Sequence, residues 1–79
     1  SAHALSSITF PSDVTSVSFY SAHLLNLKSI TCKSLVAPNI FSTGAYFSST
    51  GTLYYPKDSD YSTWLSSLGN GWVGVEIEF

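Results

Sequence analysis

Cys32 is the single cysteine of this 79-residue chain and the first side chain to consider as a nucleophile. A catalytic thiol needs a lowered pKa and an exposed, electropositive setting. Thr31 and Lys33 flank Cys32, and neither histidine stands in a sequence relation that would pair it with the thiol. One cysteine also excludes an internal disulfide and every zinc site that needs paired cysteines. The sequence therefore predicts a buried structural cysteine.

The remaining polar groups do not form a catalytic or metal-binding set. His3 and His23 lack a partner histidine or carboxylate at the i, i+2 or i, i+4 spacing of a metal site. A serine–histidine–aspartate triad can be drawn on paper, but no G-x-S-x-G motif supports it. Asp58 and Asp60 offer two carboxylates to Ca²⁺, but both are explained as caps of a following helix. We expect no enzymatic activity and neither a metal nor another cofactor.

Aromatic side chains are the best functional lead in the sequence. Tyr54 is predicted to point outward from a strand, and Tyr46, Tyr61, Trp64 and Trp72 come from nearby segments. Exposed aromatic rings could stack on sugar rings or anchor a protein partner. The alternative is that a C-terminal cap buries them, because the last coil of a solenoid needs a cover. We expect burial for Trp64, and both alternatives stay open for Tyr54.

The composition argues against several classes of partner. Charged residues make up 10% of the chain, with three basic and five acidic residues and a net charge of −2. Without a basic cluster, neither nucleic acid nor an anionic membrane surface is an expected partner. No apolar run approaches the ~18 residues of a membrane span, and no signal peptide opens the chain. The absence of methionine suggests a mature product or an excised piece, and residues 1–4 are interpreted as a vector remnant.

Three short segments repeat at a nearly constant spacing. Residues 5–10 and 27–32 share four of six residues at an offset of 22, and Leu53 follows Ile30 by 23 residues. Leucine-rich repeats have this spacing, and each contributes a short strand to a parallel sheet. The two-residue period of a strand separates a core face from a polar, uncharged face. The predicted inward residues are Leu5, Ile8, Phe10, Leu27, Ile30, Cys32, Leu53 and Tyr55, and the outward residues are Ser7, Thr9, Ser29, Thr31, Thr52 and Tyr54.

The connections between these strands are predicted to be irregular or helical. Residues 19–27 carry enough apolar side chains for a short helical turn. Residues 36–41 are expected to be irregular because the residue before a proline avoids the helical region. Residues 42–51 are predicted to form a loop with Tyr46 and Phe47 tucked in.

The C-terminal third is predicted to form a helix and a strand. The helix runs from about Asp60 to Leu68 and stops at Gly69, the first residue of a Gly-Asn-Gly turn. The alternation that follows predicts a half-buried strand. Its buried face would carry Val73, Val75, Ile77 and Phe79, and its exposed face Trp72, Gly74, Glu76 and Glu78.

The motif L-x-S-I-T-F-P-x-x-V-T-S-V, from Leu5 to Val17, resembles the BspA-type leucine-rich repeats of bacterial surface proteins. Residues 27–32, the Ala37-Pro38 pair, residues 51–61 and Trp64 are similar to the way such solenoids end. The resemblance covers most of the chain, although the usual A-F-x-x-C before the next leucine is missing after Val17. It implies a secreted or cell-surface protein that functions in adhesion or partner binding.

We therefore predict an α+β, β-rich fold: a short leucine-rich-repeat solenoid of about three parallel strands with a C-terminal helix-plus-strand cap. Residues 5–79 would form one domain, with repeat-like coils over 5–56 and the cap over 57–79. The expected function is a non-enzymatic capping and interaction module of a surface or secreted protein, stacked on upstream repeats of the same chain. The alternative is an independent carbohydrate-binding module that uses exposed aromatics. The candidate partner-binding face, for a protein or a glycan, consists of Thr9, Thr31, Tyr54 and Trp72.

Overall fold

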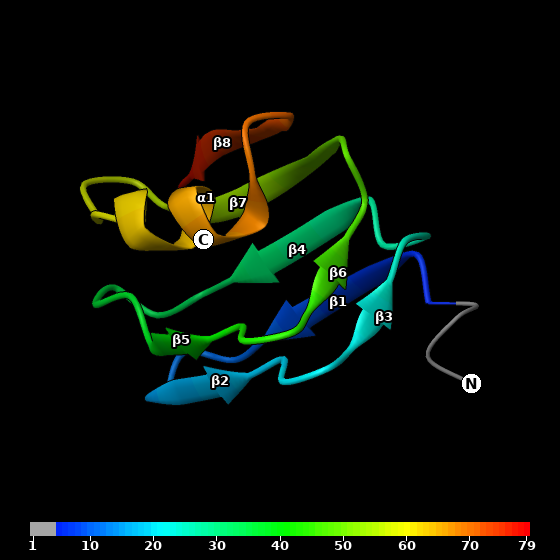
Figure 1. Ribbon diagram of the computed structural model, residues 1–79. Helices are drawn as coiled ribbons and strands as arrows, with labels where there is room; N and C mark the ends of the chain where they lie inside the picture. The colour runs from blue at the N-terminus through cyan, green and yellow to red at the C-terminus, as the bar shows by residue number, and fades with distance from the viewer. Residues whose placement is uncertain (1–4) are drawn as a thin grey trace.

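The chain winds through successive coils of parallel strands in a β-solenoid-like arrangement (Figure 1). The computed structural model describes residues 5–79, so the expectation for residues 1–4 and His3 lies outside the described residues. The first coil holds three strands, the second coil repeats them, and the third continues into a helix and a last strand. The elements are β1 (Ser7–Phe10), β2 (Ser16–Ser18), β3 (His23–Leu24), β4 (Ser29–Cys32), β5 (Asn39–Phe41), β6 (Tyr46–Phe47), β7 (Gly51–Pro56), α1 (Ser62–Leu68) and β8 (Trp72–Ile77).

The main sheet is parallel and has the order β1-β4-β7-β8. Ile8 pairs with Ile30, and Ile30 pairs with Leu53, which confirms the predicted ladder and its repeat of 22 and 23 residues. Ile30 and Leu53 are fully buried. The sheet has four strands where the sequence indicated about three, because β8 also pairs in parallel with β7.

The connections between the main strands are extended, and the predicted helical turn over residues 19–27 is wrong. β2 pairs with β5, and β3 pairs with β6, so each coil adds two short strands to the main one. The reason is a period of two: Val17 and Phe19 are buried, whereas Ser16, Ser18 and Tyr20 are exposed. The loop predicted for residues 42–51 likewise contains β6. Its Tyr46 is 57% exposed and is not tucked in, whereas Phe47 is half-buried.

Each of the first two coils has three sides, one for each of its strands, and a left-handed turn joins the second side to the third. Ser21 has a φ of 56° and Gly44 has a φ of 74°, and the two occupy equivalent positions because His23 pairs with Tyr46. The Ala22 N–H donates to the Phe19 carbonyl at 3.0 Å, and the Ala45 N–H donates to the Ser42 carbonyl at 2.9 Å. The repeat therefore extends to the backbone conformation of its corners.

Replacing Gly44 by alanine is expected to destabilise the fold by roughly 1–2 kcal/mol, the cost of the left-handed conformation for an L-residue. The new Cβ would also lie 3.3 Å from Ser21 Oγ. The converse change, Ser21→Gly, is expected to stabilise by roughly 0.5–1 kcal/mol because it removes the same strain. Chemical denaturation of both variants measures the two effects. Equal stability of Gly44→Ala and the unmodified chain would contradict a left-handed corner.

Aromatic rings fill the interior between the sheets. Phe19 makes edge-on contacts with Phe10, Phe47 and Trp64 at centroid distances of 6.2, 5.3 and 6.1 Å. Trp64 also contacts Phe10 at 6.1 Å and is fully buried, as the sequence indicated. Because Trp64 comes from α1 and Phe10 from β1, the helix is tied to the first coil through its largest side chain.

The helix begins later than the sequence indicated, at Ser62, with Tyr61 as its N-cap residue. The carboxylate of Asp60 accepts a hydrogen bond from the Ser62 N–H at 3.0 Å, which holds Asp60 outside the helix in an Asx-type turn. Gly69, with a φ of 117°, ends the helix. The helix contacts β5 of the second coil and β8 of the main sheet (Figure 1).

The structure reverses the predicted faces of β8 at Trp72, Val73 and Val75, whereas Glu76 and Glu78 are exposed as predicted. Trp72 is buried at 5% exposure, whereas Val73 and Val75 are 58% and 38% exposed. Trp72 pairs with Gly51, and a Cβ at Gly51 would lie 2.5 Å from the indole, so the missing side chain makes room for the ring. A shift of one residue reverses every side chain of a strand. The expectation of an exposed Trp72 is therefore wrong.

Candidate functional site

Three of the four residues proposed for partner binding lie in one row on the outer face of the main sheet. Thr9 pairs with Thr31, Thr31 with Tyr54, and Tyr54 with Val75 of β8. Thr9 is exposed, and Thr31 and Tyr54 are half-buried. This outer sheet row offers two hydroxyls, a phenol and an isopropyl group and contains no charged side chain, so it can form hydrogen bonds and apolar contacts.

Trp72 and two other aromatics of the lead set face the interior, and their polar atoms are already used. Tyr61 Oη donates to the Ser34 carbonyl at 2.7 Å. Trp64 Nε1 donates to the Pro38 carbonyl at 2.8 Å, and Trp72 Nε1 donates to the Ser48 carbonyl at 2.8 Å. All three carbonyls belong to the second coil, so these side chains fasten the C-terminal segment to that coil and leave nothing for a ligand.

Cys32 is fully buried in β4, where it pairs with Phe10. Burial raises the pKa of the Cys32 thiol to about 12. Burial also raises the pKa of Tyr61 to about 12, with a smaller contribution from Cys32. A thiol with so high a pKa holds almost no thiolate near neutral pH, and the thiolate is the nucleophile. The geometry matches the buried structural cysteine that the sequence predicts.

We expect the Cys32 thiol to resist iodoacetamide in the folded chain at pH 8 and to react readily once denaturant is added. Both burial and the scarcity of thiolate slow the reaction. Mass spectrometry of the alkylated chain over time measures the two rates. Cys32→Ser serves as the unreactive control. Rapid modification without denaturant would contradict the burial.

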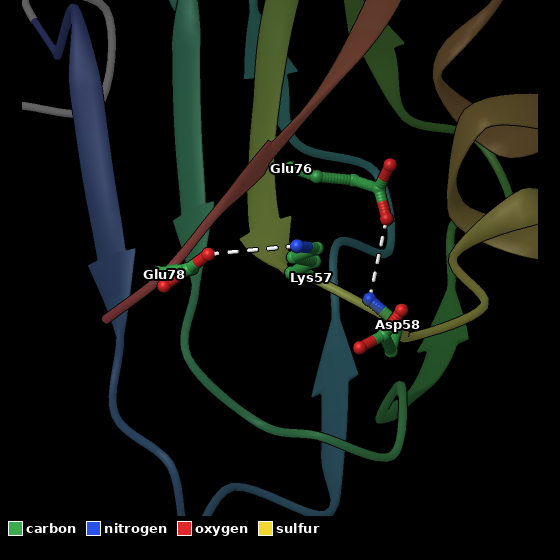
Figure 2. A network of polar contacts seen from close by, with 4 residues as sticks. All are labelled: Lys57, Asp58, Glu76 and Glu78. Carbon is green, nitrogen blue, oxygen red and sulfur yellow. Dashed lines mark hydrogen bonds and ion pairs between the residues drawn. The ribbon is translucent and has the colours of Figure 1, made fainter.

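The acidic residues near the C-terminus stabilise a turn and form no metal site (Figure 2). The Glu76 carboxylate accepts a hydrogen bond from the Asp58 N–H at 3.2 Å, at a residue with a φ of 70°. Lys57 and Glu78 form an exposed ion pair at 3.6 Å. The backbone N–H of Ser62, and then its hydroxyl, hold the pKa of Asp60 below its ordinary value. In the part of the chain that the structure describes, no three potential metal ligands are grouped together.

Four of the exposed rings lie at the corner between the second and third sides of the first two coils, and Tyr46 is the only one of them that the sequence analysis named as an aromatic lead. Phe79 is exposed at the C-terminal end. Tyr20 and Phe41 pack against each other at 6.0 Å and are 56% and 42% exposed. His23 and Tyr46 pack at 5.0 Å, and Tyr46 is 57% exposed. We call these four residues the aromatic corner. The signal was present in the sequence, because Tyr20 and Phe41 continue the exposed series of alternating residues in β2 and β5.

The other surface features carry less chemistry. A groove of about 580 Å³ runs along the turns that follow β1 and β4, and Asp13 and Lys33 are the charged residues in its lining. Between residues 5 and 79, no helix is long and apolar enough to cross a bilayer.

Comparison of the chain with protein-family models, with curated proteins and with solved structures gives no match.

Proposed function

We propose that this chain is a non-enzymatic module that ends a solenoid of leucine-rich type in a cell-surface or secreted protein. In this proposal α1 and β8 form the C-terminal cap, and β1 stacks on upstream repeats of the same chain. The outer sheet row contributes contacts to a protein or glycan partner. The observation that carries the proposal is the difference between the two edges of the main sheet.

The β1 edge is open. Ile8 is half-buried, whereas the equivalent Ile30 and Leu53 are fully buried. Phe10 is half-buried, whereas its partner Cys32 is fully buried. An edge strand also presents unpaired N–H and C=O groups, and no charged side chain lies within β1 to discourage pairing. In the same coil Val17, Phe19 and Leu24 are buried, whereas Val14 and Ala22 are partly buried like Ile8 and Phe10.

The β8 edge is closed by charge. Glu76 pairs with Tyr55, which stacks on the buried Tyr61 at 5.2 Å, so Glu76 occupies a position on the inward face. A further coil on β8 would bury this carboxylate, and burial of an unpaired charge is strongly unfavourable. Inward-pointing charges are a known means of protecting a sheet edge. The two edges therefore favour a coil at β1 and disfavour one at β8.

The alternative of an independent carbohydrate-binding module built on Tyr54 and Trp72 loses half of its site. Trp72 is buried and its Nε1 is bonded to Ser48. Tyr54 remains in the outer sheet row beside Thr31 and Val75. That row is therefore supported as an accessory contact surface, and the pair of aromatics is not.

Duplication of a coil tests the proposal. A second copy of residues 29–51, which form the 23-residue second coil, is inserted between Ser6 and Ser7. We expect the unfolding midpoint to rise, by about 4–8 °C for each kcal/mol gained, because Ile8 and Phe10 become covered. The control carries the same copy after Phe79, where Glu76 opposes stacking, and should show no gain.

Two results would contradict the proposal. One is an equal gain, or no gain, at both ends of the chain. The other comes from amide hydrogen exchange of the 79 residues alone. Strong protection of the β1 amides that does not depend on protein concentration would mean that this edge needs no neighbour.

A further inference from the structure

We propose that the aromatic corner, formed by Tyr20, His23, Phe41 and Tyr46, binds an uncharged glycan chain. The proposal concerns a different surface from the outer sheet row and does not depend on what stacks on β1. It also replaces the pair of aromatics that the sequence indicated, since Trp72 is buried and four exposed rings are grouped at this corner.

The corner consists of two ring pairs, each spanning both coils. Tyr20 of the first coil packs on Phe41 of the second, and His23 of the first coil packs on Tyr46 of the second. The left-handed turns at Ser21 and Gly44 separate the two pairs. The ring centroids lie 6.0 Å apart in the first pair and 5.0 Å apart in the second, and the ring planes are inclined to each other by 35° and 38°. Rings that already pack against a neighbour lose little freedom on binding, which favours affinity.

The turns themselves are fixed by backbone hydrogen bonds between the coils. The Ser21 N–H donates to the Thr43 carbonyl at 3.1 Å, and the Tyr46 N–H donates to the Ala22 carbonyl at 2.8 Å. The Phe19 N–H donates to the Phe41 carbonyl at 2.6 Å on the other side of the turn. The rings therefore stand on a braced part of the backbone.

The surroundings of the corner are uncharged and rich in hydroxyl groups. Residues 14–27 and 34–51 contain no aspartate, glutamate, lysine or arginine. Ser18, Ser21 and Thr43 are exposed beside the rings. The nearest lysine in the sequence, Lys28, donates its ammonium to Ser48 Oγ at 2.5 Å. Because these segments contain no lysine or arginine, the corner lacks the side chains on which binding of phosphate chains mainly depends.

A neutral glycan matches this combination better than a protein does. Sugar rings present apolar C–H faces to aromatic rings and hydroxyl edges to serine and threonine, and the corner offers both kinds of group. Aromatic side chains combine a large apolar surface with a polar atom, which suits such mixed contacts. In protein interfaces serine and threonine are under-represented among the residues that carry the binding energy, whereas Ser18, Ser21 and Thr43 are exposed beside the rings of this corner.

Titration of the ¹⁵N-labelled chain with cellohexaose, maltohexaose and chitohexaose tests the proposal. We expect at least one of them to shift the amide signals of residues 18–23 and 41–46, with a dissociation constant in the millimolar to high micromolar range. The double variant Tyr20→Ala/Tyr46→Ala should weaken that binding about tenfold or more. Phe79→Ala, which removes an exposed ring that belongs to neither the corner nor the outer sheet row, is the matched control and should bind as the unmodified chain does. The amide spectrum and thermal midpoint of each variant show that it is folded.

Three outcomes would overturn the proposal. The first is that none of the three oligosaccharides shifts the corner amides at millimolar concentration. The second is that Tyr54→Ala abolishes binding and the corner variant does not, which would place the glycan on the outer sheet row. The third is that the corner signals respond only to protein concentration, which would make the corner a contact between copies of the chain.

Discussion

Replacing Trp64 by alanine is expected to unfold the domain. The side chain is fully buried and its ring contacts Phe10, Phe19 and Tyr61 at centroid distances of 6.0–6.1 Å. Truncation of a core tryptophan typically costs about 3–5 kcal/mol. A domain of this size rarely has more than ~3–5 kcal/mol of stability in total. Circular dichroism and the amide spectrum of Trp64→Ala at 25 °C report whether a folded state remains.

Two further variants separate ring packing from the hydrogen bond. Trp64→Phe keeps an aromatic ring but leaves the Pro38 carbonyl without the indole donor that lies 2.8 Å away. We expect it to fold with a loss of roughly 1–3 kcal/mol, the cost of an unsatisfied buried polar group. Tyr20→Ala removes an exposed ring, 56% accessible, and should change stability by no more than ~0.5 kcal/mol. A folded Trp64→Ala chain that loses less than ~1 kcal/mol would contradict the central position of this residue.

The repeat itself could be predicted from the sequence because parallel coils stack equivalent residues. Identical triplets at Ser7-Ile8-Thr9 and Ser29-Ile30-Thr31 form direct neighbours in the sheet. Leu53 follows Ile30 by 23 residues and pairs with it as expected. Periodicity therefore identified three strands and their direction, since each depends only on local alternation and a constant offset. It also assigned their faces, except at Leu5, which was predicted to point inward but precedes β1 and is exposed.

The last strand shows where such reasoning stops. Val73, Val75 and Ile77 alternate as the apolar face of a strand should, yet they point outward from β8. Gly51 decides the face, because its lack of a side chain admits the Trp72 indole on the inner side. This pairing joins residues far apart in the sequence. Hydrophobic alternation within a six-residue strand contains no information about it.

The candidate site was predicted in part for the same reason. Thr9, Thr31 and Tyr54 belong to the repeat, and the register brings them into one row. The exposed aromatic corner depends instead on the course of the connections, which the sequence analysis took to be irregular or helical. Tyr46 was assigned to a loop and lies on a strand, paired with His23. Composition indicated that aromatic rings were available but not which of them remain on the surface.

The second large effect is expected at Ile30, which lies in the middle of the Ile8–Ile30–Leu53 ladder and is fully buried. Ile30→Ala should cost about 2–5 kcal/mol, because a cavity forms in a central strand that is covered by β1 on one side and by β7 on the other. The same change at the half-buried Ile8 should cost about 1–2 kcal/mol, because less apolar surface is withdrawn from water there. Urea denaturation of both variants measures the difference directly.

This comparison also probes the open edge. In the chain that carries the duplicated coil before Ser7, β1 is no longer an edge strand, and Ile8→Ala should become about as costly as Ile30→Ala. In the chain with the copy after Phe79, the cost at Ile8 should not change. A loss below ~1 kcal/mol for Ile30→Ala would show that the ladder is not the centre of the core. Equal costs at Ile8 and Ile30 in the unmodified chain would show that β1 is already covered, and the stacking of a further coil on it would then have no physical basis.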